Sequence, residues 1–531
     1  MNAGAPVLVR LALRRERGIA PWWILLLVVL ALVLVSYITR AMPTPERMAE
    51  YAELINRNSF FRALGGGFVV PDLGYLAAWR SGGFLYAFSA LAAVLAVVRH
   101  TRADEDAGRI ELLRAGTVGR CAPLTAALLV AGGVSLAGGG ATAIALIGIG
   151  MEPAGSLAYG AAVSAAGWLF GAIGAVFAQL TRTARTARAL GLYVLGAAYV
   201  LRYAGDASGL LWMKWASPLG WIHAVEPYWN DRWWMLAIPL SVSAVLVVTA
   251  YRLADRRDLG AGMLPERRGP AAAPGLRGPI SLAWRFQRDL LLKWGIAIAV
   301  AAAGAGGVST MLNQWTQAPG VTTDNLLRAF GGSPGAGLVD FGLWAMILIF
   351  AHVIALYPVL VVQRMRAEER SGRAELVQST TLTRTRWAAG HLVVLGINTA
   401  VLLAVAGGVF GTLFAVLVGD PASDIPRVLA ATLGTLPAVW LVGAICMLAY
   451  GAVPRASTAL AWAVWTAVAV LGRAAGPLYG NWGGSPLEPF HHIPNTLAGA
   501  PFDPAPALVM AVLSALLIGT GLVALRRRDF G

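Results

Sequence analysis

The chain has 531 residues, of which 57% are hydrophobic and only 13% are charged, with a mean hydropathy of +0.65. A water-soluble protein of this size needs more charge to cover its surface, so the composition excludes an ordinary soluble globular protein. The net charge of +15 would favour nucleic acid as a partner of a soluble protein. Here the charge lies in short segments between apolar runs, so we expect no nucleic acid.

Apolar runs long enough to cross a bilayer recur along the whole chain. They predict an all-α polytopic membrane protein with twelve transmembrane helices. The predicted spans are 21–39, 83–99, 121–150, 157–180, 189–204, 233–251, 294–312, 341–363, 388–417, 428–452, 456–472 and 505–525.

Arginine and lysine set the expected orientation, because cytoplasmic loops carry an excess of these residues. If the N-terminus lies inside, most of the 42 Lys and Arg residues fall in predicted cytoplasmic segments. The sequence therefore predicts a multi-pass protein of the plasma membrane with both termini in the cytoplasm.

A Pro-, Gly- and Arg-rich stretch divides the chain into two halves. It predicts a first six-span domain over 1–252, a flexible cytoplasmic linker over 253–280 and a second six-span domain over 281–531. Two further stretches, 43–58 and 281–293, have the character of helices lying on the membrane surface.

The two halves match each other in order. FRALGG at 61–66 recurs as LRAFGG at 327–332, and RADEDAGRIEL at 102–112 recurs as RAEERSGRAEL at 366–376. SPLGWIH at 217–223 recurs as SPLEPFH at 485–491, and RRDLG at 256–260 recurs as RRDFG at 527–531. An even number of spans in each half predicts a parallel repeat, with a central cavity between the halves.

The predicted loop after the second span of each half is short and charged, and has an apolar edge. A glycine between its acidic residues can turn a helix. One such loop would be an ordinary solvated loop, but two related copies favour docking of a cytoplasmic partner. The candidate docking residues are Arg102, Asp104, Glu105, Gly108, Arg109 and Glu111, with Arg366, Glu368, Glu369, Gly372, Arg373 and Glu375 as their counterparts.

This pattern, followed by Arg120 in one half and Arg384 or Arg386 in the other, resembles the coupling loop of ABC exporter permeases. More narrowly, the whole chain resembles the actinobacterial polyketide-antibiotic (tetronasin-type) and multidrug exporter permeases. The resemblance implies coupling helices near 101–115 and 365–379 and two copies of a separate soluble ATPase as partners. It also implies that ATP and magnesium bind to that ATPase, with no cofactor or metal in this chain.

In each half, one segment before the last span mixes Trp, Pro, His and Gly. Such segments suit a re-entrant extracellular gate, with an aromatic belt at the membrane surface as the alternative. The gate candidates are Trp215, Pro218, Trp221, His223, Pro486, Phe490 and His491. Glu488 and Pro489 stand where the first half has Gly220 and Trp221, so the two segments need not be equal in role.

Three absences narrow the function. A phosphate-binding loop of the GxxxxGK[ST] type needs a lysine, and neither Lys214 nor Lys293 has that context, so the chain is not its own ATPase. Asp and Glu are missing from the predicted spans, which disfavours a proton-coupled drug antiporter. A membrane-embedded lipid or glycan enzyme is disfavoured because no catalytic cluster is evident.

The sequence thus predicts a permease subunit that exports amphipathic or hydrophobic compounds, and no enzyme activity of its own. Substrate would bind in an apolar and aromatic cavity lined by the second and fifth spans of each half. Lipid contact and helix packing are the alternative roles for each candidate. The candidates are Phe84, Tyr86, Phe88, Tyr193, Tyr199, Phe350, His352, Trp462 and Trp465.

Overall fold

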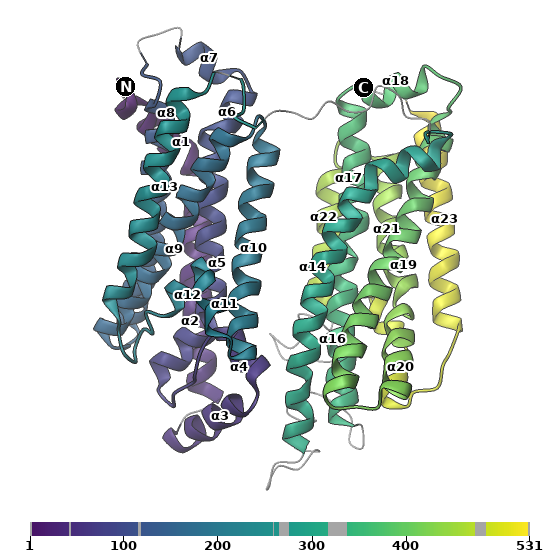
Figure 1. Cartoon of the computed structure of the whole chain (residues 1–531). Helices are drawn as coiled ribbons and strands as arrows, with labels where there is room; N and C mark the ends of the chain where they lie inside the picture. The colour runs from purple at the N-terminus through teal and green to yellow at the C-terminus, as the bar shows by residue number, and fades with distance from the viewer. Residues whose placement is uncertain are drawn as a thin grey trace. The chain divides into compact units, whose positions relative to one another are not determined.

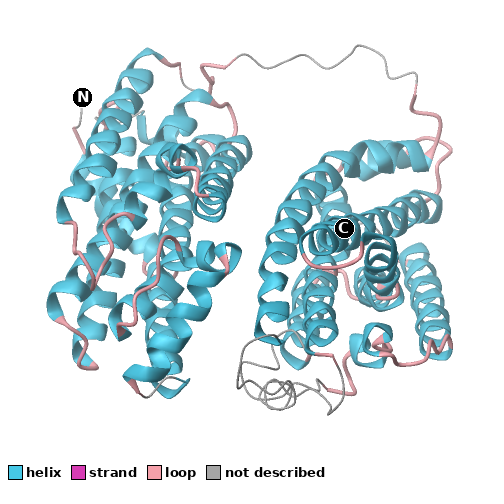
Figure 2. Cartoon of the chain, turned by 60° about the horizontal axis from the view of Figure 1, so that its bottom comes forward, coloured by secondary structure: helices cyan, strands magenta, loops and turns pink. Residues whose placement is uncertain are grey.

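The computed structural model describes residues 3–41, 44–114, 118–258, 260–264, 275–316, 337–472 and 485–528. These residues form helices joined by turns and loops, and no strand occurs among them (Figure 2). The chain separates into two compact units, Met1–Gly269 and Pro270–Gly531. The dividing point falls within the stretch 253–280.

The first unit holds the helices that correspond to the first six predicted spans. Figure 1 shows α1, α6 and α7 at one end of this unit and α3 at the other. Its helices are α1 (Ala5–Glu16), α2 (Ala20–Ala41), α3 (Pro45–Arg57), α4 (Ser59–Gly65), α5 (Leu73–His100), α6 (Arg102–Asp106), α7 (Arg109–Arg114), α8 (Ala122–Gly148), α9 (Pro153–Leu180), α10 (Ala184–Ser208), α11 (Leu211–Ala216), α12 (Pro218–His223), η1 (Trp233–Leu236) and α13 (Ala237–Arg256).

The second unit is also helical, and its helices carry the predicted spans seven to twelve. Its helices are α14 (Pro279–Thr316), α16 (Leu338–Ile354), α17 (Leu356–Arg370), α18 (Arg373–Gln378), α19 (Arg384–Leu417), α20 (Pro421–Leu433), α21 (Leu436–Ala452), α22 (Ser457–Leu471), η3 (Pro489–His492), η4 (Thr496–Ala498) and α23 (Ala505–Arg527). The surface helix expected at 281–293 is not separate, because α14 runs through it into the seventh predicted span. Its first turns pack against α19, and Gln287 donates to the His391 carbonyl there.

Ten of the described helices are long and apolar enough to cross a membrane. This supports a polytopic membrane protein. The two remaining predicted spans, the fifth of each half, lie on α10 and α22. Arg185, Arg188, Arg202 and Asp206 interrupt the apolar sequence of α10, and α22 has only 15 residues. The count of twelve spans therefore stays a prediction at these two helices.

Helices α5 and α9 form the centre of the first unit, and most of their side chains are buried. Helix α8 packs closely on α9 where two glycines face each other. A Cβ atom built on Gly139 would lie 2.1 Å from the Gly160 carbonyl oxygen, and one on Gly160 would lie 2.4 Å from the Gly139 oxygen. Small residues allow this close approach in lipid, where apolar burial does not drive helices together.

We expect Gly139→Ala to destabilise the protein by about 1–3 kcal/mol, the usual cost of forcing extra atoms into a packed core. Gly140→Ala is the matched control, because a Cβ there meets nothing within 4 Å. Thermal unfolding of the detergent-purified variants, followed by tryptophan fluorescence, measures the difference. Equal melting temperatures for the two variants would contradict this packing.

Candidate functional site

Both predicted docking loops consist of two helical pieces joined by a glycine. In the first half Gly108, with φ +70°, separates α6 from α7. In the second half Gly372, also with φ +70°, separates α17 from α18. This left-handed conformation favours glycine, so the expected glycine turn is confirmed in both copies.

Glu105 points into the first unit and away from solvent. It is only 8% exposed, and its two carboxylate oxygens accept hydrogen bonds from the two outer nitrogens of Arg257, each at 2.8 Å. The backbone N–H of Gly260 donates a third hydrogen bond at 2.7 Å. A bidentate, buried pair of this kind fixes the geometry of both partners. The carboxylate therefore ties α6 to the chain that follows α13.

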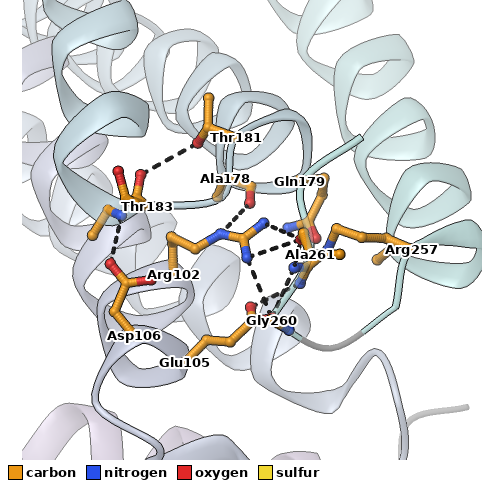
Figure 3. Close-up of polar contacts among 12 residues, drawn as sticks. Arg102, Glu105, Asp106, Ala178, Gln179, Thr181, Thr183, Arg257, Gly260 and Ala261 are labelled. Carbon is orange, nitrogen blue, oxygen red and sulfur yellow. Dashed lines mark hydrogen bonds and ion pairs between the residues drawn. The ribbon is translucent and has the colours of Figure 1, made fainter. Parts of the chain in front are cut away.

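Arg102 makes a second tie from the same short helix (Figure 3). Its side chain is buried, and its Nε donates to the Ala178 carbonyl at the end of α9 at 2.9 Å. Its two outer nitrogens donate to the Ala261 carbonyl at 3.2 Å, and one lies 3.3 Å from Glu105. Nearby, Asp106 accepts a hydrogen bond from the Ala184 N–H at the start of α10.

The first part of the predicted linker is therefore anchored. Helix α13 continues to Arg256, and residues 260–264 lie against the turn between α9 and α10. There the N–H groups of Met263 and Leu264 donate to the carbonyls of Gln179 and Leu180. The expectation of a flexible joint from residue 253 is wrong for this part, because backbone hydrogen bonds hold it. Residues 265–274 of the linker lie outside the described residues.

The second half builds the same kind of contact. Glu369 accepts a hydrogen bond from Arg528 at 2.7 Å, and another from the Tyr450 hydroxyl at 2.6 Å. The Arg528 guanidinium also lies over the Tyr450 ring, 4.9 Å from its centre. Arg366 donates to the Arg455 carbonyl at 3.0 Å and to the hydroxyl of Ser457, at the turn between α21 and α22.

Other docking candidates face outward. Arg109 is mostly exposed and reaches Asp104, which also pairs with Arg15 of α1 at 2.6 Å. Glu111 is exposed. On α18, Arg373 and Glu375 are exposed and Leu376 is 74% exposed, while Glu368 of α17 is half-buried. Each loop thus has an inward face of bound charges and an outward face of exposed ones.

The N-terminal helix α1 packs at the same end of the first unit. Glu16 is buried, 2.6 Å from the Nε2 of His100 and 3.4 Å from Arg99. Burial raises the pKa of Glu16, but the hydrogen bond with His100 and the charge of Arg99 outweigh burial and hold it below its ordinary value. Helix α1 is therefore bound to the end of α5 next to the docking loop.

The predicted gate segment of the first half forms α11 and α12. Pro218 occupies the first turn of α12, and the Trp221 indole donates to the Trp215 carbonyl at 2.7 Å. The ring of His223 meets the buried Tyr86 ring edge to face, with centres 4.9 Å apart. The structure thus brings together one gate candidate and one cavity candidate.

A buried charged cluster lies beside α12. Arg202 of α10 is fully buried and donates to the carbonyls of Ala63 and Leu64 at the end of α4. Asp206 lies 3.4 Å from Arg202 and 3.0 Å from the ammonium of Lys214. These contacts hold α4, α10 and α11 together.

The second half has a different buried pair at the matching place. Glu488 is 1% exposed, and its Oε1 lies 3.1 Å from the Nε2 of His352. The buried Phe490 ring lies against His352, with centres 4.3 Å apart, and the Trp465 indole donates to the His352 carbonyl. His352 sits near the midpoint of the candidate span Leu338–Arg370, about 21 Å along the helix from Leu338 at about 1.5 Å per residue.

The remaining candidates divide between surface and interior. Three predicted cavity residues are exposed on their own unit, and the others pack within it. Nothing tests which of them contacts substrate, so these roles stay predictions. Phe84, Tyr193 and Trp462 are exposed; Phe88, Tyr199 and Phe350 are partly or fully buried; and Pro486 accepts a hydrogen bond from His492, which neighbours His491.

Sequence reasoning missed Arg257, Arg528 and Glu488 as site residues. The signal for the two arginines was present, because RRDLG and RRDFG are matching repeats at the ends of the two halves. Glu488 lies outside every predicted span, and only the fold places it beside His352, in the last turn of α16.

Two comparisons with known proteins agree. Residues 276–526 match the family model described as the C-terminal domain of the multidrug efflux system permease Rv1217c. The whole chain is similar to the multidrug efflux system permease protein Rv1217c of Mycobacterium tuberculosis, at 39% identity over 530 residues. The match covers 98% of this chain and 94% of that protein. This chain is therefore a member of the multidrug efflux permease family that includes the mycobacterial protein.

Proposed function

We propose that this chain is the transmembrane subunit of an ATP-driven ABC exporter, powered by two copies of a separate soluble ATPase. The paired docking loops carry this proposal. Each half presents one short helix, α7 or α18, whose outward face is charged while the residues before it are bound inward. Two related loops suit a partner that binds as a pair.

The exported compounds are amphipathic or hydrophobic, and polyketide antibiotics and other drugs are candidates. The name of the mycobacterial relative supports multidrug efflux as the activity. ATP and magnesium would bind to the partner, since the sequence lacks a phosphate-binding loop with its lysine. Both termini would lie in the cytoplasm, at the docking end of their units.

Reversing the outward charges tests the docking face. We expect Arg109→Glu with Arg373→Glu to weaken binding of the ATPase at least tenfold, because each substitution reverses an exposed charge on the docking face. Co-purification and titration of the ATPase onto the nanodisc-embedded permease measure this. Arg57→Glu is the control, since it is an exposed arginine on α3, at the other end of the unit.

ATP-driven export itself is tested in vesicles that contain the permease and the ATPase. We expect drug accumulation to need ATP and to persist when the proton gradient is collapsed. Accumulation that follows the proton gradient without ATP would overturn the proposal, as would a permease that never binds an ATPase.

A proton-coupled antiporter remains the second candidate, and one observation favours it. The buried Glu488–His352 pair supplies a titratable acid beside the middle of a candidate span. Asp and Glu are thus missing from the predicted spans, but the segment that packs against His352 carries one, Glu488.

A further inference from the structure

Each half ties its docking loop to the chain after its last helix through the same pair of residue types. Glu105 pairs with Arg257 in the first half, and Glu369 pairs with Arg528 in the second. The four residues occupy matching positions of the sequence repeats, in RADEDAGRIEL with RRDLG and RAEERSGRAEL with RRDFG. A carboxylate–guanidinium contact therefore stands at matching places in both halves, bidentate in the first and made through one Glu369 oxygen in the second.

A second set of contacts accompanies each pair. Arg102 binds the end of α9, and Arg366 binds the turn after α21, which is the matching place in the second half. Arg120 donates to the Arg257 carbonyl, and Arg384 donates to the Arg528 carbonyl. In each half, these contacts thus join three chain segments on the predicted cytoplasmic side, which follow the second, fourth and sixth predicted spans.

We propose that these contacts are latches that pass movement of the docking loop to the end of the sixth helix of the same half. The first latch is Arg102, Glu105 and Arg257, and the second is Arg366, Glu369 and Arg528. This inference rests on the proposed function. It makes Glu105 and Glu369 positioning residues inside the permease, and leaves contact with the partner to the outward faces of α7 and α18.

The chemistry of the latch is better explained by transmission of movement than by a gain in the stability of the fold. Replacing a buried ion pair by apolar residues is often neutral or stabilising, so stability alone does not explain two copies. The bidentate Glu105–Arg257 pair instead fixes distance and orientation, because each N–H must meet its own oxygen. In the second half, the hydrogen bonds from Arg528 and the Tyr450 hydroxyl to the same oxygen position Glu369. In the first half the latch also holds residues 260–264, from which the chain continues toward the second half.

Hydrogen–deuterium exchange of the full-length permease in nanodiscs tests the latch. Glu105→Gln removes the charge and keeps the shape, and we expect it to speed exchange of the 260–264 amides at least tenfold. Glu111→Gln is the matched control from the same loop, because this acid is exposed. It should leave the exchange of 260–264 within twofold of wild type.

Adding the ATPase with a non-hydrolysable ATP analogue gives the second arm. In the wild type, we expect exchange to change both in α7 and in 260–264. In Glu105→Gln the change should remain in α7 and be lost from 260–264. With Glu105→Gln and Glu369→Gln combined, drug transported per ATP hydrolysed should fall at least fivefold, with the ATPase still bound.

An equal response of 260–264 in wild type and Glu105→Gln would overturn the latch, as would unchanged transport per ATP. If Glu105→Gln does not fold, Arg257→Lys replaces it, since lysine keeps the charge but cannot form the bidentate contact. Failure of the proposed function is a different result: the ATPase then alters no region of the wild type. In that case the ATPase-free arm still decides whether Glu105 holds 260–264.

Discussion

Arg202→Met is expected to lower the free energy of unfolding by about 3–5 kcal/mol, the range seen when one partner of a buried ion pair is removed. Arg202 is fully buried, and its side chain carries the contacts that join α10 to α4. Methionine fills the space but leaves the carbonyls of Ala63 and Leu64 without their donor. The Asp206 carboxylate then keeps only Lys214.

Thermal unfolding of the purified permease, followed by tryptophan fluorescence, measures this loss. Arg232→Met is the control on the same predicted side of the membrane. Its side chain is 43% exposed and pairs with Glu226 at 3.3 Å, and exposed pairs contribute at most about 1 kcal/mol. If the two variants have equal melting temperatures, the Arg202 cluster does not hold α4, α10 and α11 together.

Arg202→Lys separates charge from geometry at this position. Lysine keeps the positive charge near Asp206 but has one ammonium in place of the planar fork that reaches two carbonyls. We therefore expect a melting temperature between those of the wild type and Arg202→Met. A melting temperature equal to that of the wild type would mean that the charge alone matters.

The helices were largely predictable, because long apolar runs and arginine-rich loops are local signals. Every predicted span falls on helical residues, although 341–363 is divided between α16 and α17, and 428–452 between α20 and α21. The boundaries were less predictable: α5 begins at Leu73, ten residues before its predicted span, because Asp72 caps its start and Trp79 is buried despite the polar neighbours. Packing within the unit, which sequence does not show, decides these ends.

The inward and outward faces of the docking loops could not be predicted from the loop alone. Glu105 and Glu111 have the same chemistry and stand six residues apart, yet one is bound by Arg257 and the other is exposed. The difference arises from a contact 152 residues away along the chain. Only the matching RRDLG and RRDFG repeats hinted at such a partner.

The position of Glu488 in the second unit could not be predicted from the sequence either. The sequence places it in a loop, whereas its carboxyl group meets His352 near the midpoint of a candidate span. The Nδ1 of His352 lies 2.7 Å from the Leu348 carbonyl, which can only accept, so Nδ1 carries a proton.

Glu488→Ala is expected to abolish drug transport, because it removes the partner of His352 and releases the segment that carries Phe490. Glu488→Gln should retain transport within about threefold of wild type, since the amide N–H can donate to the Nε2 of a neutral His352. ATP-driven transport into vesicles, with hydrolysis measured in the same samples, checks both variants.

The Glu488→Gln variant also separates the two energy sources. Its amide side chain would keep a polar contact with His352 but could not take up or release a proton, so a proton-coupled antiporter would lose transport with glutamine as it does with alanine. An ATP-driven exporter needs only the contact, because its energy enters through the docking loops. Transport that survives in Glu488→Gln and fails in Glu488→Ala therefore supports ATP as the driving force. Failure in both variants, with ATP hydrolysis intact, would favour the proton-coupled alternative.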